Sequence, residues 1–254
     1  MEDGTPVSAA FDVVTTSDDR RCASTTLLRA ASGQVPTQHA LIGGGHVRWS
    51  DRRDGDLAGS GPAVERRRQQ VVGLPWTVLH QVHGHQVMVV GSPGEGSGAQ
   101  ADGAVTAVPG AAVAVLTADC APVALASDEG VIGVAHAGWR GLGAGVVAET
   151  VEVMRSLGAT HIQAVLGPCI RTACYPFGAD DLEDVVRRTG PEVRGLDRAG
   201  HPALDVTAGV MAALRRAGVD DVDDVGTCTG CSDVHWSWRQ GRDQGRQATV
   251  VWRT

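Results

Sequence analysis

Short apolar runs separated by turns and helical stretches are the feature of this chain that most limits its fold. Six runs rich in Val, Ala, Leu and Ile have the length and composition of buried strands: Val87–Val90, Ala111–Leu116, Val123–Ala126, Val131–Ala135, Ile162–Leu166 and Ala248–Trp252. Helical patterns lie at Leu142–Leu157, Ala179–Arg188 and Val206–Ala217, and an amphipathic helix is expected from Ala63 to Gly73. Strands mixed with helices predict a mixed sheet covered by helices.

The first 62 residues give the weakest pattern. Apolar patches at Ala9–Thr15 and Thr25–Ala31 are interrupted by Gly, Ser and charged residues, and Ser50–Pro62 is expected to be an exposed loop. No repeat or low-complexity tract divides the chain, so we predict one domain over residues 1–254.

The composition excludes several partners and reactions. A net charge of −7 argues against a nucleic-acid or anionic-membrane partner, because both require a basic surface. The sequence has no run of 18 apolar residues and no secretory signal pattern, so we expect a cytoplasmic protein. All 22 basic residues are arginine, which rules out a Schiff-base lysine, a pyridoxal-phosphate anchor and a P-loop lysine. Nothing in the sequence indicates an oligomeric state.

Three short segments contain the strongest candidates for metal-ligating or catalytic residues: HQVHG at His80–Gly84, TADCAP at Thr117–Pro122 and AHAGWRG at Ala135–Gly141. They supply His83, Cys120 and His136, one thiol and two imidazoles. A catalytic zinc site typically has three protein ligands of this kind and an open fourth position. The three residues therefore predict a zinc site in an enzyme.

The turn Ser127–Gly130 predicts a hairpin between its two flanking apolar runs. This hairpin places Cys120 and His136 at the same end of neighbouring strands, whereas His83 comes from another loop. The pair also fits a nucleophile and base dyad, or a buried cysteine beside core histidines. The glycines of AHAGWRG favour a functional role, because they are unfavourable unless backbone approaches a ligand closely.

Other polar residues are weaker candidates. Asp119, beside Cys120, is the nearest general acid or base, although it equally fits a turn cap. Arg140, Arg239 and Arg246 are candidate phosphate-binding residues, with a solvated loop as the alternative for the last two.

The six cysteines are expected to remain outside disulfides in a cytoplasmic protein. The pair Cys228 and Cys231, in CTGC, together with Cys169 and Cys174 would make a four-cysteine metal site. We favour small buried thiols instead, because the spacing of Cys169 and Cys174 is wider than usual for such sites.

From about residue 63 onward the chain resembles the YfiH/YlmD family, also known as the laccase-domain family. The resemblance rests on QVHG, ADG, TADCAP and HAGWRG in this order, followed by GPCI, CYPFG, CT and SWRQGRDQGRQA. It implies a single α+β domain with a mixed β-sheet core and helices packed outside, in which residues 1–62 are a divergent N-terminal part. It also places the metal ligands at His83, Cys120 and His136.

The resemblance implies zinc-dependent purine nucleoside phosphorylase activity on adenosine, inosine and methylthioadenosine, with some adenosine deamination. The implied partners are a purine nucleoside and phosphate. Bacterial relatives are also linked to peptidoglycan editing, which would suit an amidase that uses Cys120 and His136. The older laccase name implies copper, which we disfavour because multicopper chemistry requires several histidine-rich clusters. A zinc-stabilised binding module is the non-enzymatic alternative.

Overall fold

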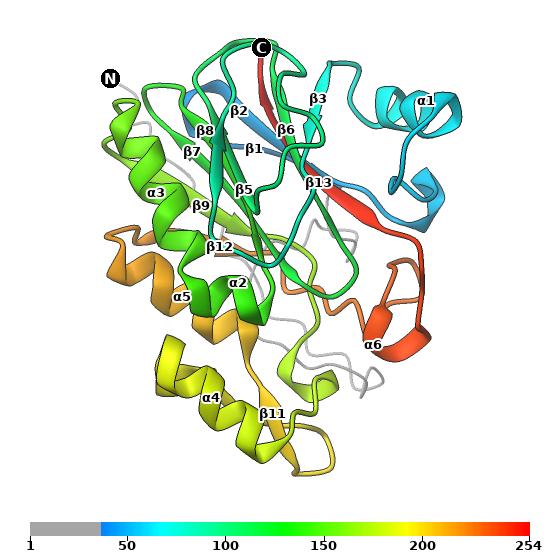
Figure 1. The fold of residues 1–254 in the computed structure, drawn as a ribbon, viewed down its shortest axis with the longest axis vertical. Helices are drawn as coiled ribbons and strands as arrows, with labels where there is room; N and C mark the ends of the chain where they lie inside the picture. The colour runs from blue at the N-terminus through cyan, green and yellow to red at the C-terminus, as the bar shows by residue number, and fades with distance from the viewer. Residues whose placement is uncertain (1–36) are drawn as a thin grey trace, which may run out of the picture.

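The computed structural model describes residues 37–254, so the predictions for Ala9–Thr15 and Thr25–Ala31 lie outside the described residues. Two β-sheets form the centre of the molecule (Figure 1). One sheet has five strands, in the spatial order β1 (Gln38–Ala40), β2 (Gly45–Trp49), β13 (Gln247–Arg253), β6 (Ala112–Thr117) and β3 (Trp76–Val78). Its neighbours are antiparallel except for β3 and β6.

The second sheet has six strands, in the order β12 (Asp221–Asp224), β9 (Ile162–Leu166), β7 (Ala121–Ser127), β8 (Ile132–Ala137), β5 (Gly103–Thr106) and β4 (Val87–Val89). The pairs β12–β9 and β4–β5 are parallel and the other neighbours antiparallel. Strands β10 (Arg194–Leu196) and β11 (Pro202–Leu204) form a separate hairpin. The mixed sheets confirm the predicted fold class, and β7–β8 confirms the predicted hairpin.

The main core lies between the two sheets. Val47, Val113 and Val251 of the five-stranded sheet share one buried cluster with Ala124 and Val134 of the other sheet. Side chains alternate along a strand, so residues two apart share a face. His136 is therefore on the inner face with Val134, and Thr117 is on the inner face with Val113. Both residues come at the ends of their strands, which places them at one end of the sandwich.

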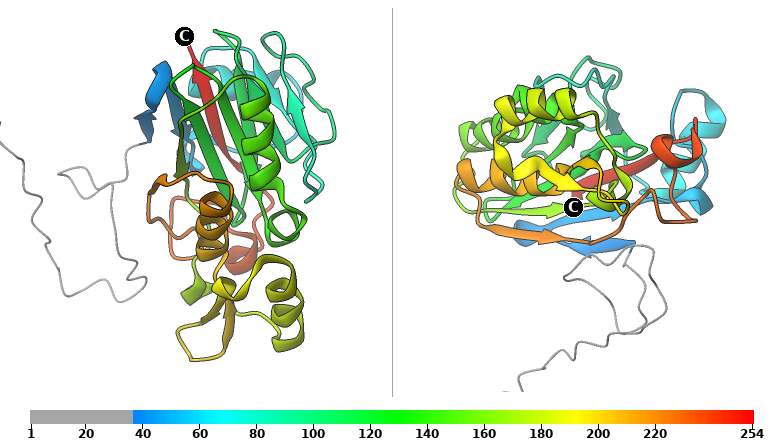
Figure 2. Two further views of the ribbon diagram at one scale, coloured as in Figure 1. Left: turned by 90° about the vertical axis from the view of Figure 1, so that its left-hand side faces the viewer. Right: turned by 90° about the horizontal axis from the view of Figure 1, so that it is seen from below.

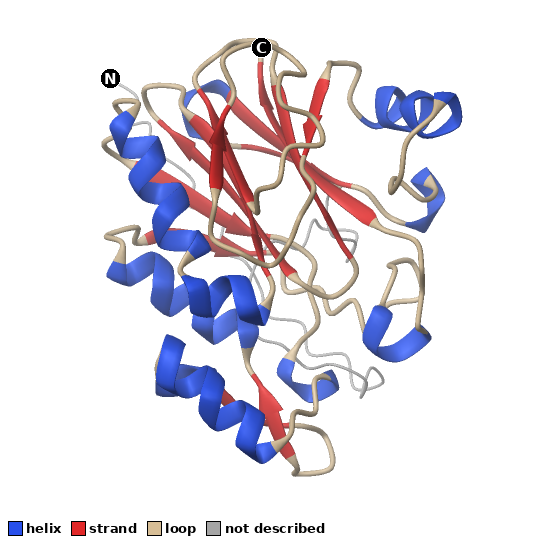
Figure 3. Ribbon diagram, viewed as in Figure 1, coloured by secondary structure: helices blue, strands red, loops and turns tan. Residues whose placement is uncertain are grey.

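Helices cover the outer faces, as predicted (Figures 2 and 3). The structure contains α1 (Pro62–Val71), α2 (Trp139–Ala144), α3 (Val146–Ser156), α4 (Ala179–Thr189), α5 (Val206–Arg216) and α6 (Trp238–Gly241). Apolar residues of α3 and α5 pack on the six-stranded sheet, and Val71 of α1 packs on the five-stranded sheet. None of the helices in residues 37–254 is long and apolar enough to span a membrane.

Two local predictions are corrected. The helix expected over Leu142–Leu157 is divided into α2 and α3 at Gly145, whose φ of 94° is left-handed and accessible to glycine. The segment Ser50–Pro62 is an exposed loop only at residues 59–61, because Leu57 is fully buried and Asp51 caps a 3₁₀ turn at Arg52–Asp54.

A three-residue link carries the chain from one sheet to the other and positions the candidate site. Strand β6 of the five-stranded sheet ends at Thr117, and β7 of the six-stranded sheet begins at Ala121. Within this link Asp119 has a φ of 98°, an uncommon conformation for a residue other than glycine. Cys120 thus lies where the two sheets meet.

Candidate metal centre

The structure brings His83, Cys120 and His136 together from three separate elements. One ligand atom from each residue lies within 4.8 Å of the other two. The imidazole rings of His83 and His136 have centroids 4.8 Å apart and are inclined by 64°. The predicted group of one thiol and two imidazoles therefore exists as a spatial cluster.

His83 is held by its backbone. It lies in the loop between β3 and β4 with a φ of 60°, a left-handed conformation that a non-glycine residue adopts mainly when its surroundings impose it. The fully buried carboxylate of Asp102 accepts hydrogen bonds from the backbone N–H groups of Val82, His83 and Gly84, at 3.1, 2.9 and 2.7 Å. One side chain therefore fixes the whole turn that presents His83.

The same carboxylate also orients His136. Asp102 Oδ1 lies 2.8 Å from His136 Nδ1, and His136 is 3% exposed. With Nδ1–H donated to Asp102, the lone pair of Nε2 remains for a metal, an arrangement common among metal-binding histidines. Asp102 is not among the site residues predicted from the sequence, although it lies in the ADG motif that contributed to the family resemblance.

Gly138 provides the space that the cluster needs. Its φ of −67° is open to any residue, so backbone conformation does not require glycine here. A Cβ added to Gly138 would lie 2.7 Å from His83 Nδ1 and 3.0 Å from Cys120 Sγ. Gly138 of AHAGWRG therefore allows the backbone to approach the His83 and Cys120 side chains closely, and the approach of a bound ligand stays a prediction.

The electrostatics of the two histidines differ. Burial lowers the pKa of His83, and the neighbouring positive charge of His136 lowers it further. Burial also opposes protonation of His136, but the Cys120 thiolate and the Asp102 carboxylate together raise its pKa to about 9. The pKa of Asp102 is lowered despite its burial, because His136 and the N–H groups of the His83 turn bind the carboxylate.

The raised pKa of His136 predicts a pH-dependent stability of metal-free protein. Protonated His136 stabilises the fold fully below its unfolded-state pKa of about 6.5, and this contribution is lost as pH rises toward 9. The shift corresponds to about 3 kcal/mol. Metal-loaded protein should lack this loss, because a ligating imidazole is already neutral. Thermal unfolding of chelator-treated and metal-loaded protein from pH 6 to 9.5 checks this; parallel curves would contradict it.

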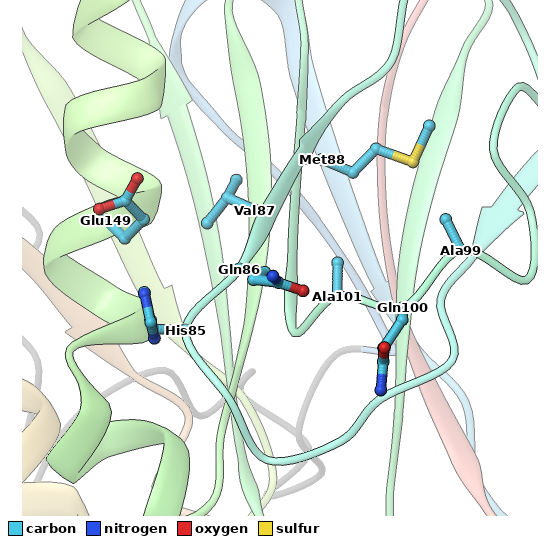
Figure 4. Close-up of a pocket in the computed structure, with 8 residues that line it drawn as sticks. All are labelled: His85, Gln86, Val87, Met88, Ala99, Gln100, Ala101 and Glu149. Carbon is cyan, nitrogen blue, oxygen red and sulfur yellow. The ribbon is translucent and has the colours of Figure 1, made fainter.

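A cavity of about 660 Å³ opens beside the cluster. His83, Cys120 and His136 line it, and so do Thr117, Trp238 and Arg246. The cluster is therefore connected to a space large enough for a small organic ligand. A smaller hollow of about 410 Å³ lies along β4, where His85 and Glu149 point toward the same space (Figure 4). His85 is not part of the His83–Cys120–His136 cluster.

The three predicted phosphate-binding arginines are not gathered at one point. Arg246 lines the cavity, and its guanidinium donates hydrogen bonds to the carbonyls of residues 243, 244 and 245. The Arg239 guanidinium lies 4.6 Å from the Tyr175 ring centroid and donates to a backbone carbonyl. The Arg140 guanidinium lies 4.0 Å from the Trp139 ring centroid. Of the three, Arg246 alone lines this cavity.

Asp119 connects the link between the sheets to the C-terminal region. Its carboxylate oxygens accept hydrogen bonds from Thr229 Oγ1 at 2.7 Å and from the Arg239 backbone N–H at 2.6 Å. The residue is 6% exposed. This geometry gives Asp119 a positioning role next to Cys120, and its role as a general acid or base stays a prediction.

Among the cysteines outside this site, Cys169 and Cys228 are buried thiols outside disulfides, as expected. Cys174 and Cys228 form a cluster with Cys231 in which Cys174 Sγ and Cys231 Sγ are 3.0 Å apart. Cys231 is disulfide-bonded, so the prediction that the cysteines remain outside disulfides is wrong for this residue. We assign no metal to this cluster.

The chain is similar to known proteins in sequence. Residues 55–254 match the family model described as multi-copper polyphenol oxidoreductase laccase. The chain is 44% identical over 178 residues to a purine nucleoside phosphorylase of Streptomyces coelicolor, covering 68% of this chain and 73% of that protein. It is 35% identical over 240 residues to a purine nucleoside phosphorylase of Deinococcus radiodurans, covering 89% and 92%.

Solved structures share the fold. A Neisseria meningitidis protein assigned to DUF152 superposes with a TM-score of 0.73 at 30% identity, covering 83% of this chain and 94% of that protein. YlmD from Geobacillus stearothermophilus superposes with a TM-score of 0.72 at 25% identity, covering 84% and 93%. The sheets and helices described above are thus an arrangement seen in crystal structures.

Proposed function

Because the chain belongs to the YfiH/YlmD laccase-domain family, we propose that it is a zinc-dependent purine nucleoside phosphorylase. Its substrates are adenosine, inosine and methylthioadenosine, with phosphate as the second substrate and adenosine deamination as a side activity, in the cytoplasm. Relatives named purine nucleoside phosphorylase at 35–44% identity support this proposal. The observation that carries it is the His83–Cys120–His136 cluster facing a cavity of about 660 Å³.

The residues present fit a zinc ion. One thiolate and two imidazoles are a common donor set for catalytic zinc, Asp102 orients one imidazole, and Gly138 leaves room for the ligands. A bound zinc ion would act as a Lewis acid toward the nucleoside or phosphate, or would hold the water that deaminates adenosine. The cavity beside three protein ligands provides the open position that catalysis requires, which favours an enzyme over a binding module.

The chain's own residues would bind and orient the reactants. In phosphorolysis a phosphate oxygen forms a bond to C1′ of the ribose while the C1′–N9 bond breaks, and the departing purine takes up a proton. Arg246 on the cavity wall would bind phosphate, and Arg140 and Arg239 remain further candidates. Asp119 is the candidate that would donate this proton to the purine. Its hydrogen bonds also fix the three-residue link that contains Cys120.

The proximity of Cys120 and His136 also supports a second candidate function. The two side chains would act as nucleophile and base of an amidase that edits cell-wall precursors. Zinc content separates the two functions, because a thiolate that ligates zinc is less free to attack carbon. A copper polyphenol oxidase is less well supported, since only one of the two groups in residues 37–254 with the geometry to hold a metal ion contains histidine.

The proposed function is tested by product analysis of the purified protein. Incubation with adenosine and phosphate should release adenine and ribose 1-phosphate, and adenine release should stop when phosphate is omitted. Inosine formed without phosphate would reveal deamination. Zinc should be present at about one equivalent per chain by elemental analysis. Zinc-loaded protein that releases no adenine from adenosine and no hypoxanthine from inosine would contradict the proposal.

A further inference from the structure

Two side chains that line the cavity have a burial or exposure that the His83–Cys120–His136 cluster does not explain. Thr117 is 2% exposed, and its Oγ1 has no hydrogen-bond partner within the described part of the chain. Trp238 has the opposite character, because this large apolar side chain is 42% exposed. Both residues line the same cavity as His83, Cys120 and His136. Thr117 thus has a hydroxyl without a partner among residues 37–254, and Trp238 exposes an apolar ring whose described contact is the Arg242 guanidinium, 5.4 Å from the ring centroid.

Thr117 marks the inner end of the cavity. It is the last residue of β6, on the inner face of its sheet, and three residues before Cys120. A buried hydroxyl without a partner is unfavourable, because it has lost its hydrogen bonds to water. A polar group of a bound ligand would supply the missing partner. Thr117 therefore indicates that the inner end receives a hydroxyl or another hydrogen-bonding group.

Trp238 marks the outer edge of the cavity, and it is held in place. It is the first residue of α6, where the Ser237 hydroxyl accepts a hydrogen bond from the Gln240 backbone N–H at 3.2 Å. The next residue, Arg239, is tied through its backbone N–H to Asp119 beside Cys120. A positioned and exposed indole is a good surface for a planar aromatic ring, which it contacts by stacking.

We propose that these two residues set the orientation of the nucleoside, with the purine base stacked on Trp238 and the ribose directed inward to Thr117. In this orientation a ribose hydroxyl forms a hydrogen bond with Thr117 Oγ1, and the sugar lies next to the His83–Cys120–His136 cluster. The inference rests on the proposed function, because it takes a purine nucleoside as the ligand. Beyond that function, Trp238 is assigned to contact the base and Thr117 to contact the sugar.

The orientation is tested by measuring the binding of hypoxanthine and inosine to the metal-containing full-length protein by calorimetry, without phosphate. Trp238→Ala should lower the affinity for both ligands at least about 10-fold, whereas the affinities of Trp238→Phe should stay within about threefold of the wild type. Thr117→Val should weaken inosine about 5- to 10-fold and leave hypoxanthine unchanged, and Thr117→Ser should restore inosine binding. Leu196→Ala, at an exposed residue that does not line the cavity, is the control.

The outcomes separate this inference from the proposed function. Inosine binding that is unaffected by both Trp238→Ala and Thr117→Val would overturn the orientation and leave the proposed function standing. Equal loss of hypoxanthine and inosine in Thr117→Val would also overturn it, because Thr117 would then contact the base. A wild-type protein that binds neither ligand would overturn both proposals. Thermal unfolding and zinc content measured on every variant identify changes that arise from misfolding.

Discussion

Replacing Cys120 with alanine should remove the bound metal and lower phosphorolysis by at least about 100-fold. Cys120 supplies the one thiol of the cluster, and its ligand atom lies within 4.8 Å of those of His83 and His136. Without it two imidazoles remain, which are too few to hold zinc tightly. The measurements are zinc content per chain and the rate of hypoxanthine release from inosine in the presence of phosphate.

The matched control is Cys169→Ala, which removes a fully buried thiol outside the cluster. This variant should retain zinc and activity, although it will be less stable because it leaves a small cavity. If Cys120→Ala loses activity but keeps one zinc per chain, the thiol is not a required ligand. That result would contradict the proposed site and favour Cys120 as a nucleophile.

Much of the fold was accessible from local sequence patterns. The apolar runs that became β4, β6, β7, β8, β9 and β13 are continuous and bounded by turn residues, so their identity as strands was readable. Strand β12 was missed because its sequence, DVDD, is acidic and lies at the edge of the sheet. Strands β1 and β2 were missed because they are short and their sequence lacks a continuous apolar run.

The candidate metal ligands were also readable, because each is a chemically distinctive residue beside a glycine or proline. The residues that surround and orient these ligands could not be predicted from the sequence. Asp102 acts on residues 18 to 34 positions away, and no local pattern connects it to the turn of His83 or to His136. Thr117 and Trp238 are ordinary in sequence and become informative only through burial and exposure around a common cavity. For the arginines the sequence was less informative, because Arg239 and Arg246 are seven residues apart and only Arg246 lines the cavity.

Asp102→Asn should lower zinc affinity about 10- to 100-fold, although the substitution hardly changes the size of the side chain. The carboxylate accepts four hydrogen bonds, three from the turn of His83 and one from His136 Nδ1. An amide has one acceptor oxygen, so two of the four donors lose their acceptor: either the N–H groups of Val82 and Gly84, or the His83 N–H and the His136 imidazole. The loss of negative charge should also lower the pKa of His136 in the folded protein. The decline in stability of metal-free protein, which starts near the unfolded-state pKa of about 6.5, should therefore be smaller and end at a lower pH.

Competition with a chelator measures the zinc affinity, and thermal unfolding against pH measures the change at His136. The control is Asp128→Asn, because Asp128 pairs with His161 Nδ1 at 3.0 Å on the exposed surface. Exposed ion pairs of this kind contribute little to the stability of the fold, so the control should match the wild type in both measurements. Wild-type zinc affinity in Asp102→Asn would show that His83 and His136 keep their positions without this carboxylate. In that case the cluster would be held by the surrounding sheets alone.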